Sequence, residues 1–131
     1  MKTLIIIDVQ NDFMPGGALE VPKGDLIVPV INHMQSQFDL IVATQDWHPS
    51  NHISFASNHP NRKLFEKIIC QGVEQTLWPE HCIKGTIGAE FHHQLDTQAI
   101  EAIFRKGTAP KFDSYSGFYD NGHYKNTGLA G

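Results

Sequence analysis

Short apolar runs separated by polar stretches rich in Gly, Pro and Asn set the pattern of this 131-residue chain. The run TLIIIDVQ, residues 3–10, is rich in β-branched residues and predicts a strand buried on both faces. DLIVATQD, residues 39–46, has the same character, and a third strand is expected within TQAIEAIFRKG, residues 97–107. Apolar runs of this kind are typical of parallel sheets.

The segment between the first two runs has helical spacing. Leu26, Val30 and Met34 recur at that spacing within residues 25–37, and Asp25 is the expected N-cap. The order strand, loop, helix, strand indicates a parallel α/β sheet with a right-handed crossover. We therefore predict an α/β fold with three layers, in which helices flank a parallel sheet.

The remaining chain is less regular. Residues 47–92 lack a strong period, although RKLFEKIICQG, residues 62–72, is expected to form a short helix, and residues 108–131 read as a turn-rich loop. The length predicts a single domain spanning residues 1–131. Because one helix would leave sheet faces uncovered and the sequence stops on NTGLAG, we expect this domain to lack a C-terminal part.

Composition narrows the class of protein. A net charge of −4 gives no reason to expect nucleic acid or an anionic membrane as a partner, and no run approaches the roughly 18 apolar residues of a membrane span. Two cysteines, Cys70 and Cys82, form no disulfide framework and favour a cytoplasmic location. The eight histidines are many for this length and suggest metal binding or acid–base chemistry.

Charged residues stand where the predicted strands end. Asp8, Asp46 and Lys106 each close an apolar run, and the carboxyl ends of parallel strands meet at the edge where α/β proteins place their sites. Either Asp8 or Lys106 alone would read as a loop cap or a solvated charge. Burial without a partner would be costly, so we expect these groups to pair with one another.

QDWHPSNH, residues 45–52, predicts a metal site. Asp46 and His48 are two positions apart, so in extended backbone their side chains face the same way. A third ligand is expected from His52 or His81, with Cys82 as a further option, while a hydrogen-bonding role for His52 is an equal alternative. An Asp–His–His set suits one divalent ion, zinc first, with iron or manganese as alternatives.

Four segments resemble the nicotinamidase (pyrazinamidase) branch of the isochorismatase-like cysteine hydrolases. These are IIIDVQNDFMPGGAL, VATQDWHPSNHISFAS, LWPEHCIKGTIGAEFH and FRKGTAPKFDSYSGF. They appear in the family order and cover essentially the whole chain. The Asp-x-His stretch followed by Trp-Pro-x-His is the most specific part of the resemblance, because isochorismatases and related hydrolases lack this metal site.

The resemblance implies a role for each matching residue. It implies that Asp8 is the catalytic acid/base and that Lys106 is the catalytic lysine. The implied metal ligands are Asp46, His48 and His81, and His52 matches a position that ligates in some members only. The two aromatics implied to sandwich a pyridine ring are Phe13 and Trp78, and the two residues implied to line the pocket are Leu19 and Tyr115. Taken without the resemblance, loop aromatics such as Phe13, Trp47 and Trp78 are often minor-core anchors.

The activity implied is hydrolysis of nicotinamide to nicotinate and ammonia, and of pyrazinamide, through a cysteine thioester. The family nucleophile lies in a later Ala-Thr-Asp-x-Cys-like motif that the 131 residues do not contain, and neither Cys70 nor Cys82 matches it. Two alternatives therefore stay open: an inactive metal- and nicotinamide-binding fragment, or a hydrolase of another small amide. A small-molecule substrate is the expected partner, and a homo-oligomer or association with the missing C-terminal part is left open.

Overall fold

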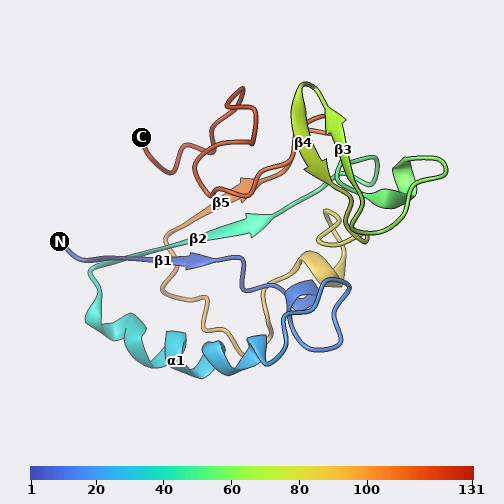
Figure 1. Ribbon diagram of the computed structural model, residues 1–131. Helices are drawn as coiled ribbons and strands as arrows, with labels where there is room; N and C mark the ends of the chain where they lie inside the picture. Colours follow the sequence, from blue (N-terminus) through green and yellow to red (C-terminus); the bar gives the residue numbers. More distant parts are fainter.

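A computed structural model describes residues 1–131. Its main sheet contains β1 (Thr3–Ile7), β2 (Leu40–Asp46) and β5 (Ala102–Lys106), all parallel, in the order β1-β2-β5. The helix α1 (Ile27–Met34) returns the chain from β1 to β2 along one face of this sheet (Figure 1). The predicted α/β fold, the parallel sheet and the three strands are confirmed.

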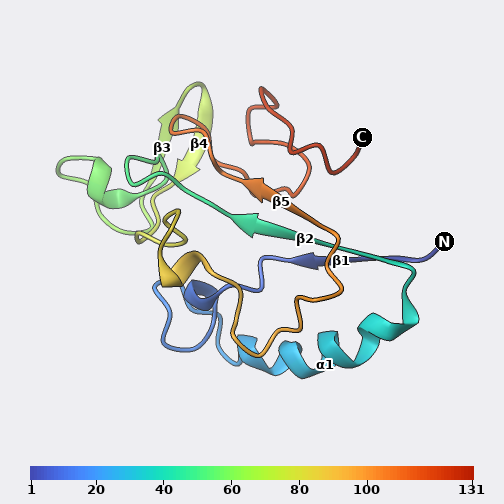
Figure 2. The same cartoon turned by 180° about the vertical axis from the view of Figure 1, so that it is seen from behind.

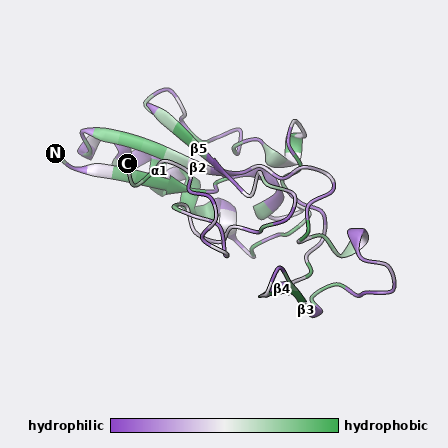
Figure 3. Cartoon of the chain, turned by 90° about the horizontal axis from the view of Figure 1, so that it is seen from above, coloured by the Kyte–Doolittle hydropathy of each residue, from purple (hydrophilic) through white to green (hydrophobic).

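The hydrophobic core lies between the sheet and α1. Ile6 of β1, Ile41 and Ala43 of β2, and Val28 of α1 are buried together, and Leu95 joins them from the segment that leads to β5. Figure 2 shows this segment running along the same face as α1, and Figure 3 shows β2 coloured as one of the apolar parts of the chain. These contacts fix the strand register on which the positions of the strand ends depend.

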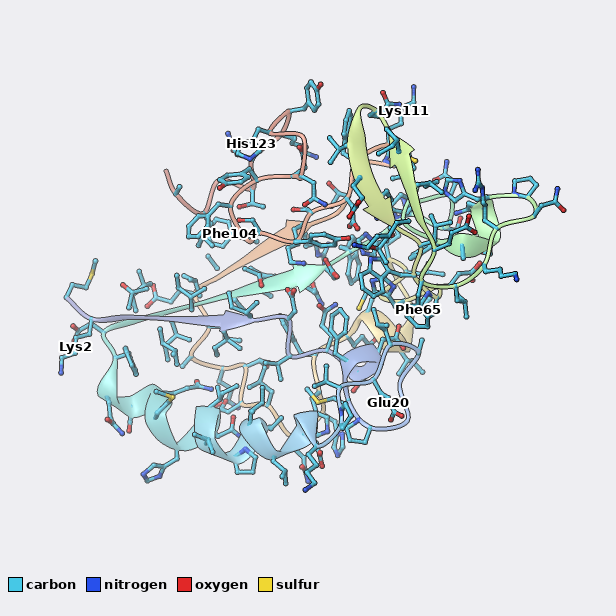
Figure 4. All side chains as sticks on the ribbon, viewed as in Figure 1. Lys2, Glu20, Phe65, Phe104, Lys111 and His123 are labelled. Carbon is cyan, nitrogen blue, oxygen red and sulfur yellow. The ribbon has the colours of Figure 1, made fainter.

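The opposite face is covered unevenly. The C-terminal tail lies over β2 and β5, where a side chain at Gly117 would touch Thr44, and Phe104 points toward the tail (Figure 4). On β1, by contrast, Ile5 and Ile7 are 38% and 54% exposed. The prediction that the first strand is buried on both faces is therefore wrong, because only the face that carries Ile6 is covered.

The helical segment follows the predicted range with a different start. A 3-10 turn, Gly24–Leu26, leads into α1, and a second, Gln35–Gln37, continues it. Asp25 lies inside the first turn and does not cap the helix, whose N-cap is Leu26 without a side-chain hydrogen bond. None of the helices combines the length and the apolar character that crossing a bilayer requires.

Residues 62–72 do not form the expected helix. β3 (Lys67–Cys70) and β4 (Val73–Thr76) pair as an antiparallel hairpin that stands beside the end of the main sheet (Figure 1). Gln71 and Gly72 in the turn have φ values of 51° and 75°. Two successive left-handed residues are what a tight hairpin turn requires, so Gln-Gly was the turn signal in this segment.

Candidate functional site

Three strand ends meet around the ammonium group of Lys106. Its Nζ lies 2.9 Å from Oδ2 of Asp8 and 2.5 Å from Oδ1 of Asp46, and it donates to the carbonyl of Ser114 at 3.1 Å. The pairing expected from the sequence is therefore confirmed. An ammonium group has three donors, so the buried Lys106 is fully satisfied.

The two carboxyl groups beside Lys106 differ in acidity. Burial acts to raise the pKa of Asp46, but the hydrogen bond to His48 and the charge of Lys106 outweigh it and lower that pKa to about 2. Burial raises the pKa of Asp8 despite the nearby Lys106. For Lys106, burial opposes the charge, but the charges of Asp46 and Asp8 raise its pKa. Such a difference between the two pKa values suits a site in which Asp46 stays ionised while Asp8 can exchange protons.

Asp8 is held in an unusual backbone conformation. It follows β1 with a φ of 49°, in the left-handed region that non-glycine residues seldom adopt. The hydroxyl of Thr44 donates to Oδ1 of Asp8 at 2.7 Å, which leaves Oδ2 to Lys106. Strain of this kind concentrates at functional sites, where the surrounding contacts stabilise it.

Asp46, His48 and His81 can together hold a metal ion. One ligand atom from each lies within 4.8 Å of the others, and all three residues are buried. Oδ2 of Asp46 is 3.5 Å from Nε2 of His48 and 3.8 Å from Nε2 of His81. The ligand atoms therefore converge on one point from the end of β2 and from the loop after β4.

Backbone carbonyls orient both histidine rings. Nδ1 of His48 lies 2.8 Å from the carbonyl of Gly107, and Nδ1 of His81 lies 2.7 Å from that of Pro79. Since a carbonyl only accepts, each Nδ1 carries a proton, and Nε2 is the nitrogen of each ring that is left to bind a metal ion. Burial lowers the pKa of His81. Burial also acts to lower that of His48, but the hydrogen bond and charge of Asp46 outweigh it and raise the pKa.

His52 uses both ring nitrogens within the protein. Nε2 donates to the carbonyl of Phe112 at 3.0 Å, so Nδ1 accepts from the hydroxyl of Ser54 at 2.7 Å. Burial and the charge of His48, whose ring centroid is 4.1 Å away, lower the pKa of His52 to about 4. Of the two roles left open by the sequence, this geometry favours the hydrogen-bonding one. Cys82 is outside the ligand cluster and donates its N–H to Asp12.

The loops that carry these residues are tied to one another by backbone hydrogen bonds. The N–H of His48 donates to the carbonyl of Cys82 at 2.9 Å, and the carbonyl of His48 accepts from the N–H of Lys84 at 2.8 Å. Trp78 donates its backbone N–H to the carbonyl of Ser54 at 2.7 Å. Within the stretch of residues 47–92, these hydrogen bonds hold the segment around His48 against the segment around His81.

A cavity of about 220 Å³ joins the metal-binding cluster to the Asp8–Lys106 pair. The cavity is lined by Phe13 and Trp78, the two residues expected to sandwich a ring, and by Leu19 and Tyr115, the two expected to line the pocket. Nε1 of Trp78 donates to the Tyr115 hydroxyl at 3.3 Å. The other lining residues are polar: Asp8, Asp46, His81, Lys106, Asp113 and Ser114. Trp47 is outside this cavity and stacks beneath the guanidinium of Arg105 at 3.8 Å.

Residues 2–122 match the sequence pattern of one protein family, the isochorismatase domain. The chain belongs to the isochorismatase domain family. It is 51% identical over 128 residues to a nicotinamidase of Acinetobacter baylyi, covering 98% of this chain and 60% of that protein. A second relative, a nicotinamidase of Escherichia coli, is 46% identical, with 98% of this chain and 62% of that protein covered. The chain thus spans about three fifths of the length of these relatives.

Two solved structures, a nicotinamidase/pyrazinamidase and a pyrazinamidase, share this fold. A nicotinamidase/pyrazinamidase of Acinetobacter baumannii superposes with a TM-score of 0.94 at 50% identity, over 97% of this chain and 61% of that one. A pyrazinamidase of Pyrococcus horikoshii, solved in complex with zinc, superposes with a TM-score of 0.68 at 43% identity, over 88% of this chain and 57% of that one. The fold described above is therefore shared with these two structures.

Asp113 is a cavity residue that the sequence did not single out. It is only 5% exposed, and a carboxylate oxygen lies within 4.8 Å of ligand nitrogens on His48 and His52. In the sequence it stands in KFDSYSGF, within a tail of polar and aromatic residues that reads as surface loop. Its position shortly after Lys106 was the one sequence feature that could have indicated a place near the site.

Gly107 is expected to be essential for the orientation of His48. Its φ is 63°, and a β-carbon there would collide with the His48 ring that its carbonyl anchors. Gly107→Ala should therefore tilt the imidazole and weaken metal binding about 10- to 100-fold, the range seen when outer contacts of a ligand are lost. Isothermal titration with Zn²⁺ measures this. Gly72→Ala is the matched control, since Gly72 has a φ of 75° with nothing within 4 Å. Equal affinities in the two variants would contradict the role of Gly107.

The low pKa of Asp46 predicts an acid-dependent loss of stability. A folded pKa of about 2 against the ordinary 3.8 stabilises the fold above pH 4, by about 2 kcal/mol, and this contribution disappears as the pH falls from about 4 to 2. In Asp46→Asn the free energy of unfolding should fall less steeply across that window. Urea denaturation of the metal-free protein at several pH values measures both slopes, and parallel curves would show that Asp46 is not the group responsible.

Proposed function

We propose that the protein hydrolyses nicotinamide to nicotinate and ammonia, with pyrazinamide as a second substrate. The observation that carries the proposal is that one cavity is lined by an aromatic pair, the Asp8–Lys106 pair, and two members, Asp46 and His81, of the three-residue ligand set. The curated relatives named above are nicotinamidases, and the printed name of the Acinetobacter baumannii structure includes both activities. A small heteroaromatic amide suits a cavity of about 220 Å³.

The ligand set and the aromatic residues would bind and orient the ring. Asp46, His48 and His81 offer one oxygen and two nitrogens to a divalent ion, for which we propose zinc, with iron and manganese as alternatives. When bound, this ion supplies a Lewis acid for the ring nitrogen of the substrate. Phe13 and Trp78 would hold the faces of the ring, so that the carboxamide points toward Asp8 and Lys106.

Asp8 would move protons in an amide hydrolysis through a thioester. With its raised pKa it is suited to take the proton of a cysteine thiol, while the charge of Lys106 favours the thiolate. The thiolate adds to the carboxamide carbon, Asp8 protonates the departing ammonia, and the resulting thioester is then cleaved by a water that Asp8 deprotonates. The products are nicotinate, ammonia and the regenerated thiol.

We propose that the thiol comes from a segment beyond these 131 residues. Cys82 is completely buried, does not line the cavity, and has a pKa raised by burial, while Cys70 lies on β3 of the hairpin. β1 has a free edge in the sheet order β1-β2-β5, and Asp8 follows β1 directly. A further parallel strand paired with this edge would end beside Asp8. A protein whose cysteines stay as free thiols suits the reducing cytoplasm, and we propose this location for it.

Binding without turnover is the second candidate function. The absence of a cysteine among the residues that line the cavity favours it, since the ligand set and the aromatics alone can hold a pyridine ring. Ammonia release from nicotinamide, assayed on the zinc-loaded protein together with its intact mass, separates the candidates. Release from material heavier than the 14.7 kDa of this chain supports the amidase. Nicotinamide binding without any release from that heavier material would overturn it.

His48→Ala should affect substrate binding more than chemistry. Losing one of three ligands removes the ion that orients the ring, so we expect KM for nicotinamide to rise about 10- to 100-fold, with a much smaller fall in kcat. Steady-state kinetics on the full-length protein measures both constants. The control is His33→Ala, which removes an exposed histidine from α1. An unchanged KM with a collapsed kcat would contradict the orienting role.

A further inference from the structure

Asp113 is a buried carboxylate that makes no ion pair. Its side chain accepts two hydrogen bonds from neutral donors, the backbone N–H of Ser114 to Oδ1 at 2.8 Å and Nε2 of Gln75 to Oδ2 at 2.9 Å. It takes part in none of the salt bridges of the chain. Because buried charges are normally paired or close to a metal ion, its negative charge calls for a cation nearby.

The charges around the cavity indicate which cation this is. Asp8, Asp46 and Asp113 bring three carboxylates to the lining, and Lys106 brings one ammonium that is already shared by Asp8 and Asp46. With the histidines neutral, the cluster is left two charges negative, which is the charge that one divalent ion neutralises. The third carboxylate therefore fits an ion held at Asp46, His48 and His81.

Asp113 is placed to act on this ion from outside its ligand shell. Its carboxylate lies within 4.8 Å of ligand nitrogens on His48 and His52. A second ion between these three side chains would have to break the contacts that occupy both nitrogens of His52. It would also have to share His48, whose Nε2 faces Asp46. An outer carboxylate beside one ion requires none of these changes.

The hairpin fixes the position of this carboxylate. Gln75 of β4 is only 4% exposed, and its Nε2 also donates to the carbonyl of Thr76 at 2.7 Å. On the other side, Ser114 binds Asp113 through its N–H and Lys106 through its carbonyl. Asp113 thus joins the β3–β4 hairpin to the stretch that anchors the buried lysine.

We infer that Asp113 is a positioning residue for the metal ion, whose buried charge, held by Gln75 and Ser114, strengthens the binding of a divalent cation at Asp46, His48 and His81. This inference rests on the metal site proposed above. It gives the hairpin, which contributes no ligand of its own, a part in building the site.

Asp113→Asn tests the inference because it removes the charge while keeping the shape of the side chain. We expect its affinity for Co²⁺ and Zn²⁺ to fall about 10- to 100-fold, as for other outer-shell partners of metal ligands. Co²⁺ titration of the full-length protein, followed by visible absorption, reports affinity, stoichiometry and ligand geometry. The expected result is one ion per chain with an unchanged spectrum at saturation, in a variant that still unfolds cooperatively although its amide oxygen can accept only one of the two hydrogen bonds that Asp113 receives.

Two further variants separate charge from folding. Glu74→Gln removes the same charge from the exposed neighbouring residue of β4 and should leave the affinity within twofold. Gln75→Met keeps the carboxylate but removes its donor, and it should lower the affinity severalfold even if Asp113→Asn does not fold. An affinity of Asp113→Asn within twofold of the parent would overturn the inference. If Asp113→Asn does not fold, an affinity of Gln75→Met within twofold of the parent would overturn it. So would two ions per chain, which would make Asp113 a direct ligand. A parent protein that binds no metal would instead refute the proposed metal site.

Discussion

The buried ammonium of Lys106 is the interaction on which the arrangement of the site depends. An unpaired charge at this depth would be strongly destabilising, so the ends of β1 and β2 and the segment after β5 bring oxygens to it. Asp8 and Asp46 each use one carboxylate oxygen for this purpose, which leaves a second oxygen on Asp46 facing His48 and His81. One lysine therefore links Asp8 to the cluster of Asp46, His48 and His81.

The rest of the site is built by irregular backbone that is held in place by hydrogen bonds. Carbonyls of Gly107 and Pro79 select the tautomers of the two histidine ligands, and paired backbone bonds between the His48 and Cys82 loops set their separation. A loop that provides ligands must be rigid, because metal affinity depends on the orientation of each ring. The long segment between β2 and β5 contains little regular structure, but its loops are joined by such hydrogen bonds.

Strong local signals made much of this predictable from the sequence. Apolar runs ending in Asp8, Asp46 and Lys106 predicted both the parallel sheet and the charge cluster, because strand ends in such a sheet share an edge. The hairpin at residues 67–76 was missed, since its apolar residues also fit a helix and only the Gln-Gly turn decides between them. Burial of β1 and the role of Asp113 depend on which distant segments pack there, and local pattern does not contain that information.

The convergence of three ligands beside the Asp8–Lys106 pair is the central claim, and the most direct test is anomalous diffraction at the zinc edge from crystals grown with ZnCl₂ and nicotinate. We expect one peak in the cavity, at about 2.0–2.2 Å from Asp46, His48 and His81, with the nicotinate ring between Phe13 and Trp78 and its carboxylate toward Lys106. A peak between His48, His52 and Asp113, or a nicotinate bound away from these residues, would contradict it.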